Sequence, residues 1–154
     1  MTDSIPYLII KYIHILAAIV AVGINVSYGV WIIRAQRDAS HTGFALKGIK
    51  FLDDRIANPS YGVVLVSGLA MVFVGGYGLT TLWIDVAVAL FVAVIVIAAV
   101  FYSPTLRDQI KLVEAGDTTS AEFARLGRRG QMLGQAIGVI VLAILVLMVF
   151  KPHL

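Results

Sequence analysis

A lysine, a histidine, an asparagine and a tyrosine share one face of the first apolar segment, residues 5–33. At the helical angle of about 100° per residue, Lys11, His14, Asn25 and Tyr28 fall on one stripe, with small alanines between them. The other faces carry Ile, Leu, Val and Ala, as contact with lipid requires. An uncompensated ionisable group in hydrocarbon costs about 2.5–3.5 kcal/mol. We therefore expect groups inside the protein to meet Lys11 and His14.

His14 is the only histidine within an apolar segment. A neutral imidazole there can ligate haem iron or another metal, or relay protons. The alternative is a histidine that is hydrogen-bonded across a helix bundle. Zinc or copper would require several His, Cys or carboxylate ligands, whereas the chain has no cysteine and only Asp85 is expected nearby. Haem iron therefore suits His14 better than a multi-ligand metal site.

Three further residues could serve such a site, and each has a simpler interpretation. Lys11 could hold a haem propionate or a substrate carboxylate, or its ammonium group could reach the lipid headgroups. Met71 could be a second haem ligand, or a packing residue in an apolar helix. Asp85 could neutralise Lys11 or Lys151, or it could be an interfacial carboxylate favoured by a helix N-terminus.

The composition is typical of a membrane protein, so the expected partner is a lipid bilayer. Hydrophobic residues make up 60% of the 154 residues and charged residues only 14%. The net charge of +3 comes from basic residues beside apolar segments, so lipid headgroups and topology explain it, and we expect no nucleic-acid partner. The first segment is too long for a signal-peptide core and indicates an uncleaved anchor.

Four segments are long enough to cross a hydrocarbon core of about 30 Å, which requires about 20 helical residues. They are residues 6–33, 59–79, 82–103 and 133–150. The expected fold class is all-α, an integral membrane four-helix bundle forming one domain over residues 1–154.

Local signals indicate where these helices begin and end. Asn58 is the expected N-cap of the second span, with Pro59 in its first turn, and Pro104 is expected to stop the third span. The motif Thr119-x-x-Glu122 indicates a capping box for a helix that runs into the fourth span. The end of the second span is marked by three glycines: Gly75, Gly76 and Gly78.

Basic residues are concentrated in the first and third loops, so the positive-inside rule places these loops in the cytoplasm and both termini on the outer, periplasmic side. Apolar residues at helical spacing in the first loop also predict a short amphipathic helix at the cytoplasmic interface. This topology predicts one layer, towards the outer side, that collects the groups with unusual chemistry: Lys11, His14, Met71, Asp85 and Lys151.

Several short motifs resemble a four-helix bacterial membrane family of undefined function. That family is similar in layout to the J-type bacterial protoporphyrinogen IX oxidase and to the membrane domain of CopD-type copper-resistance proteins. The resemblance covers nearly the whole chain. It rests on Tyr7-Leu-Ile-Ile-Lys11-Tyr-Ile-His14 followed by Gly23, on Asn58-Pro59 with Ser67-Gly68-Leu69, on the Pro104 segment, and on Met148-Val-Phe-Lys151-Pro152.

The J-type oxidase binds b-type haem through a histidine of its first helix and carries a lysine towards the chain end. The resemblance therefore implies His14 as the axial ligand and Lys151 as a further cofactor-binding residue. The Trp-x-x-Gly-Leu-x-Tyr-x-Pro-Arg run of that enzyme is absent; the matching stretch here contains Asn25 and Tyr28 and is followed by Arg34.

Two functional hypotheses follow. The first is a haem b protein of the bacterial inner membrane, redox-active towards a porphyrin or quinone and able to form a homo-oligomer. The second is a small transporter or accessory subunit without haem, in which Lys11, His14 and Asp85 form a structural or proton-linked cluster.

Overall fold

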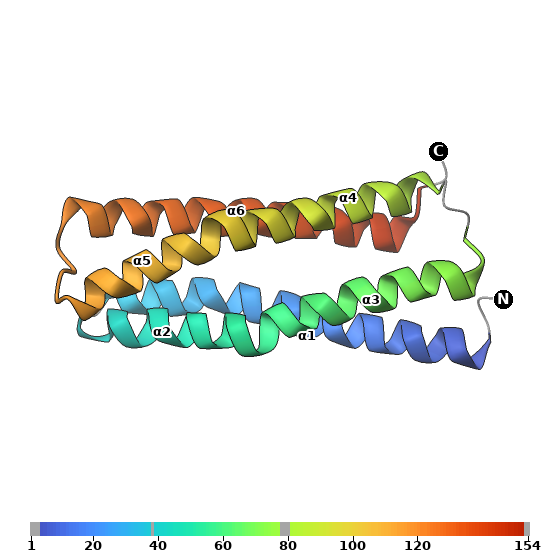
Figure 1. The fold of residues 1–154 in the computed structure, drawn as a ribbon, viewed down its shortest axis with the longest axis horizontal. Coiled ribbons are helices and arrows are strands. Elements are labelled where there is room, and N and C mark those ends of the chain that lie inside the picture. The colour runs from blue at the N-terminus through green and yellow to red at the C-terminus, as the bar shows by residue number, and fades with distance from the viewer. Residues whose placement is uncertain (1–3, 38, 78–80, 153–154) are drawn as a thin grey trace. The chain divides into compact units, whose positions relative to one another are not determined.

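The structure is a computed structural model that describes residues 4–37, 39–77 and 81–152. Within these ranges every regular element is a helix, which confirms the all-α prediction (Figure 1). The elements are, in order, α1 (Ile5–Arg37), the short 3-10 helix η1 (Ala39–His41), α2 (Thr42–Leu52), the π-helix η2 (Asp53–Ala57), α3 (Asn58–Gly75), α4 (Leu82–Val96), the π-helix η3 (Ile97–Tyr102), α5 (Ser103–Glu114) and α6 (Ala121–Phe150).

Four continuous helices are long and apolar enough to cross a membrane, which confirms the predicted number of spans. They run over Ile5–Ala35, Thr42–Gly75, Leu82–Glu114 and Ala121–Phe150. Most of their large apolar side chains are exposed on the chain's own surface, which a lipid environment would cover. The side of the membrane on which the termini lie remains a prediction.

The two internal prolines follow π-helices and do not begin or end helices, so two of the predicted boundaries are wrong. Asn58 is not an N-cap, because its backbone is helical and its N–H donates to the Asp53 carbonyl, five residues back. Pro104 does not stop the third span, because Ser103 makes the same kind of bond to Ala98 and α5 follows directly. A proline has no N–H to donate, and the wider π-turn before it lets the helix continue without that bond.

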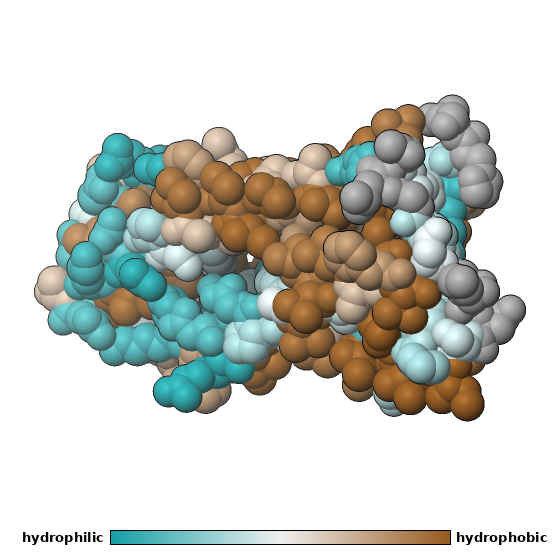
Figure 2. Space-filling model, turned by 45° about the vertical axis from the view of Figure 1, so that its right-hand side comes forward, coloured by the Kyte–Doolittle hydropathy of each residue, from teal (hydrophilic) through white to brown (hydrophobic). Residues whose placement is uncertain are grey.

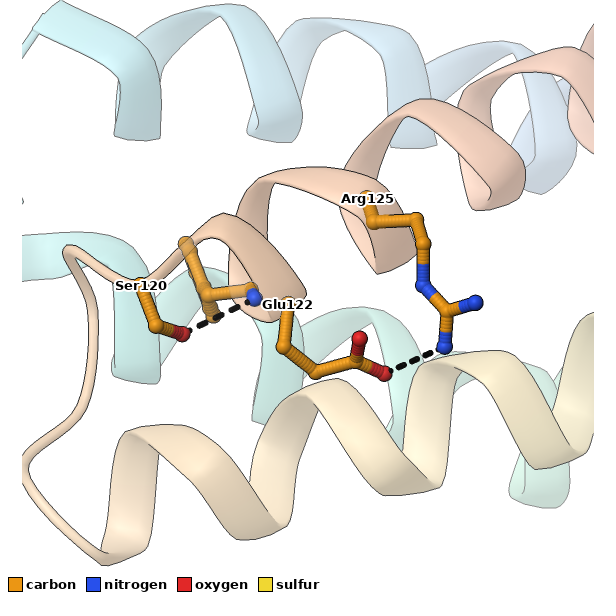
Figure 3. Close-up of polar contacts among 4 residues, drawn as sticks. Ser120, Glu122 and Arg125 are labelled. Carbon is orange, nitrogen blue, oxygen red and sulfur yellow. Dashed lines mark hydrogen bonds and ion pairs between the residues drawn. The ribbon is translucent and has the colours of Figure 1, made fainter.

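Two other helix termini carry the expected type of end signal: a left-handed glycine follows α3, and a hydroxyl residue caps α6. α3 ends at Gly75, and Gly76 adopts a left-handed conformation at φ 67°, as predicted for the glycines; the expected positions Gly78 and Leu79 lie outside the described residues. The capping prediction at Thr119 is wrong by one residue. Ser120 is the N-cap of α6, and its Oγ accepts the Phe123 N–H at 3.1 Å (Figure 3).

The described chain forms two compact units. The first unit contains Met1–Gly29 and Phe51–Thr81, and therefore most of α1 with η2 and α3. Side-chain hydrogen bonds join α1 to α3 in antiparallel register, from Tyr7 with Tyr77 at one end to Tyr28 with Asp53 at the other. These bonds position the site described below.

The second unit contains Val30–Lys50 and Leu82–Leu154. In it α4 packs along α6, and α5 packs on the first part of α6. The predicted first-loop helix is present as α2, which buries Ala45, Leu46 and Ile49 and pairs Lys47 with Glu114 of α5 at 2.9 Å. Figure 2 shows hydrophilic residues gathered where α5 turns into α6.

Candidate functional site

The site of the first unit is built around His14, which lies in the first third of the apolar part of α1 and is half-buried. Its Nδ1 lies 3.0 Å from the Val64 carbonyl oxygen and 3.0 Å from Ser67 Oγ, both on α3. Ser67 is only 7% exposed. The expectation that groups inside the protein meet His14 is thus fulfilled by a backbone carbonyl and a hydroxyl of the neighbouring helix.

These bonds determine which ring nitrogen carries the proton. A carbonyl oxygen only accepts, so Nδ1 must donate its hydrogen to Val64. The Ser67 hydroxyl donates to the Val63 carbonyl of its own helix, which leaves its oxygen free to accept from Nδ1 as well. The neutral imidazole therefore has its lone pair on Nε2.

A glycine makes the close approach of the imidazole to α3 possible. A Cβ at Gly68 would lie 3.5 Å from His14 Nδ1 and only 3.1 Å from Cε1, and the second distance is tighter than ordinary van der Waals contact. Gly75 plays the same part opposite Tyr7, where an added Cβ would lie 2.9 Å from the Tyr7 ring. The two helices are therefore packed directly against each other at both levels.

The antiparallel register also places Lys11 and Met71. Because Tyr7 faces Gly75 and His14 faces Gly68, Lys11 lies level with Met71, one turn from His14. Met71 follows Ser67 by four residues, so it lies on the side of α3 that faces α1, and it is half-buried. Lys11 is exposed and forms no ion pair within the described part of the chain.

Asn25 and Tyr28 do not join His14 but form a second polar cluster about three to four turns further along α1. Asn25 Nδ2 donates to the Ala21 carbonyl at 2.9 Å and to the Tyr61 hydroxyl at 2.7 Å. The Tyr28 hydroxyl donates to Asp53 Oδ1 at 3.3 Å. Asp53 is 8% exposed, so this carboxylate is buried beside η2.

Sequence reasoning missed Asp53 and Tyr61 and did not pair Ser67 with His14. A signal for two of them was present: Tyr61, Val64, Gly68 and Met71 recur at helical spacing with Ser67 beside them, which makes a face of small and polar residues on α3. Asp53 could not be separated from its neighbour Asp54, which is exposed. Only the π-turn and the register of the two helices turn Asp53 inwards.

Asp85 and Lys151 belong to the second unit. Asp85 is exposed in the first turn of α4 and forms no ion pair with Lys151 among the described residues. Lys151 ends α6 in a left-handed conformation at φ 43°, and its Nζ lies 5.9 Å from the centre of the Trp83 ring. Lys151 therefore makes a cation–π contact rather than a carboxylate pair.

No group of three or more His, Asp or Glu side chains that could hold a metal ion is found among residues 4–37, 39–77 and 81–152. A metal bound there by side chains alone would lack the ligand number that zinc or copper sites use. Haem iron differs, because the porphyrin supplies four of its ligands and the protein supplies one or two.

Comparison with known proteins extends over almost the entire chain. Residues 8–152 match a family described as "Predicted integral membrane protein (DUF2269)". No curated protein and no solved structure matches the chain.

Proposed function

The chain belongs to the DUF2269 family of integral membrane proteins, and we propose that within this multi-pass protein His14 is an axial ligand of a b-type haem. The single observation that carries the proposal is the hydrogen bond from His14 Nδ1 to the Val64 carbonyl at 3.0 Å. Ligating histidines characteristically donate their other ring N–H to a carbonyl or carboxylate, which fixes the tautomer and raises the basicity of the ligating nitrogen.

The residues around His14 fit such a ligand. Val64 and Ser67 hold the ring from one side, and Gly68 lets it lie close to the α3 backbone, so Nε2 has one orientation. No hydrogen bond to Nε2 is found among the described residues. A haem bound there non-covalently would supply one-electron redox chemistry. The chain has no cysteine to form the thioether links of a c-type haem, which is compatible with a b-type haem.

Lys11 supports the same placement. It lies one turn from His14 on α1, is exposed, and has no carboxylate partner in the described chain, so its ammonium group is available to an anionic group. Haem propionates are such groups, and a lysine at the membrane interface would meet their charge.

The other candidate residues have different places in the proposal. Met71 faces α1, but the two helices are in direct contact at Gly68 and Gly75, so no macrocycle fits between Met71 and His14. Asn25 and Tyr28 belong to the Asp53 cluster. Asp85 and Lys151, in the second unit, keep their proposed role as charges near the outer surface.

The finer assignment rests on resemblance. The J-type oxidase, which the motifs around Lys11, His14 and Lys151 resemble, binds haem b through a first-helix histidine. By analogy we place this protein in the bacterial inner membrane and propose a porphyrin or a quinone as its redox partner. A second copy of the chain could cover part of its exposed apolar surface.

An absorption spectrum of the detergent-purified full-length protein tests the proposal. We expect a Soret band, with α and β bands after reduction, in the parent protein. His14→Ala should abolish these bands, because no other nitrogen lies at this position. The matched control is His41→Ala: His41 is exposed in η1, outside the first unit, so its removal should leave the spectrum unchanged.

Each outcome is decisive when elution in detergent shows that the variants are folded. An unchanged haem content in His14→Ala would assign the iron to another residue and overturn the proposal. A featureless spectrum in the parent protein, even after expression with added haem, would overturn it as well.

The buried Asp53 favours a second candidate function, a proton-linked transporter or accessory subunit. Its carboxylate accepts a hydrogen bond from the Tyr28 hydroxyl and is buried within a pair of membrane-spanning helices. Ionisable groups inside membrane proteins commonly mark proton or ion paths. From the sequence alone, this second hypothesis rests on Lys11, His14 and Asp85. With the structure it rests on His14 and Asp53, which both belong to the first unit. A parent protein without haem bands, whose activity in vesicles responds to a pH gradient, would favour this function.

A further inference from the structure

The second compact unit contains a cavity of about 320 Å³ that neither haem nor the Asp53 cluster uses. It lies between the end of α1, α2, the start of α5 and the start of α6, and it is partly open to the outside. Its volume falls at the lower end of the range of about 300–1,000 Å³ that is typical of small-molecule sites. The cavity is therefore large enough for part of a ligand.

One wall of this cavity is apolar and belongs to the face that α2 buries. Ala45, Leu46 and Ile49 line it together with Ile32 of α1 and Leu106 of α5. Such a wall has no polar group to offer, so the part of a ligand that lies on it must be a hydrocarbon.

The part of the cavity lined by α6 adds a basic and an amide side chain to Phe123, Ala124 and two glycines. Arg128 and Gln131 line it, and Gln109 of α5 lies beside Gly127, where an added Cβ would come within 3.0 Å of its Nε2. None of the cavity's lining residues in the described chain is acidic, and Arg128 forms no ion pair with any described residue. The cavity thus pairs a hydrocarbon surface with an arginine that lacks a counter-ion.

Arg128 differs in this respect from its neighbour Arg125, one turn earlier on α6. Arg125 is paired with Glu122 at 2.7 Å, does not line the cavity and extends from the helix towards that carboxylate (Figure 3). The residues of α6 that line the cavity lie between Phe123 and Gln131, before the apolar span predicted at residues 133–150, so we expect the cavity at the level of the lipid headgroups.

We propose that this cavity binds an anionic phospholipid, with its phosphate at Arg128 and the first part of an acyl chain against α2 and Leu106. The phosphate of either lipid can pair with the Arg128 guanidinium, but the choline ammonium of a zwitterionic headgroup offsets that attraction, so Arg128 favours an anionic headgroup. Gln109 and Gln131 supply hydrogen-bond donors to the headgroup. This site is separate from the proposed haem site, so either proposal can fail without the other.

Native mass spectrometry of the full-length protein in detergent, titrated with phosphatidylglycerol or phosphatidylcholine, tests this site. We expect the parent to bind phosphatidylglycerol more tightly. Arg128→Gln should weaken that binding about fivefold, which corresponds to ~1 kcal/mol for one basic residue at a lipid headgroup. Arg125→Gln, which changes the net charge equally, should bind like the parent. Equal binding of both lipids, or equal losses in the two variants, would overturn the proposal.

A second pair of variants tests the cavity itself. Ala124 lines the cavity and is exposed, so Ala124→Leu should fill space without disturbing buried packing and should displace the lipid. Ala136→Leu adds the same side chain at an exposed position of α6 outside the cavity and should bind like the parent. If Ala124→Leu binds phosphatidylglycerol as the parent does, the lipid lies elsewhere and the proposal is wrong.

Discussion

The side chains of the first unit meet backbone carbonyls and hydroxyls rather than opposite charges. His14 bonds to Val64 and Ser67, and Asn25 bonds to Ala21 and Tyr61. Neutral partners suit a hydrocarbon environment, because a full charge pair would carry a large desolvation cost there. The buried Asp53 carboxylate likewise meets a neutral hydroxyl, that of Tyr28.

Tyr28→Phe removes one donor from the buried Asp53 carboxylate and keeps the ring. We expect a loss of about 1–3 kcal/mol in the free energy of unfolding, because the buried Asp53 carboxylate loses one of its hydrogen-bond donors. Tyr12→Phe is the matched control on the same helix, since Tyr12 is 67% exposed and should change the stability little. Equilibrium unfolding in mixed detergent measures both, and equal effects would contradict a structural role for the Tyr28 hydroxyl.

The sequence identified one half of the candidate site. The helical stripe on the first segment placed His14, Asn25 and Tyr28 on the side of α1 that faces α3, and the hydrogen bonds agree with that placement. The same stripe gave Lys11 a buried position, but it is exposed. The partners could not be predicted, because they depend on the register between helices about fifty residues apart, and periodicity carries no information about register.

Whether a helix continues past a proline is likewise not predictable from the local sequence. Pro59 and Pro104 have two possible consequences: the helix ends, or a preceding π-turn absorbs the missing N–H. The residues around each proline do not distinguish between these two outcomes. In the structure both helices continue, and η2 rotates Asp53 and Ala57 inwards while Asp54 and Ile56 stay exposed.

The N-terminus of α6 offers an element-level prediction with its control one residue away. Ser120 Oγ accepts the Phe123 N–H, whereas Thr119 is exposed and precedes the helix. Ser120→Ala should therefore lower the free energy of unfolding by about 1 kcal/mol, the usual cost of losing an N-cap. Thr119→Ala should cost little. The same detergent unfolding experiment compares them, and a larger loss in Thr119→Ala would restore the capping box expected from the sequence.

For the whole molecule, the number of spans was predictable because it depends only on length and hydropathy, which the chain displays in four separate runs. The division into two compact units was not, since it depends on how the helices pair. One consequence of that pairing bears on topology. Lys47 of the first loop pairs with Glu114 beside the third loop, so in the second unit these two basic segments lie on the same side of the membrane.

The positive-inside rule then predicts which side this is. Basic residues are concentrated beside α2 and at the turn between α5 and α6, so we expect that turn in the cytoplasm and both termini outside. Alkaline phosphatase, which is active only outside, should be active when fused before Met1 or after Leu154. A fluorescent protein inserted at Gly116, in the exposed α5–α6 turn, should fold in the cytoplasm. If alkaline phosphatase were active when fused at Gly116, the predicted topology would be inverted. Lys11 and Lys151 would then face the cytoplasm, and the proposed haem propionates would also have to lie on that side.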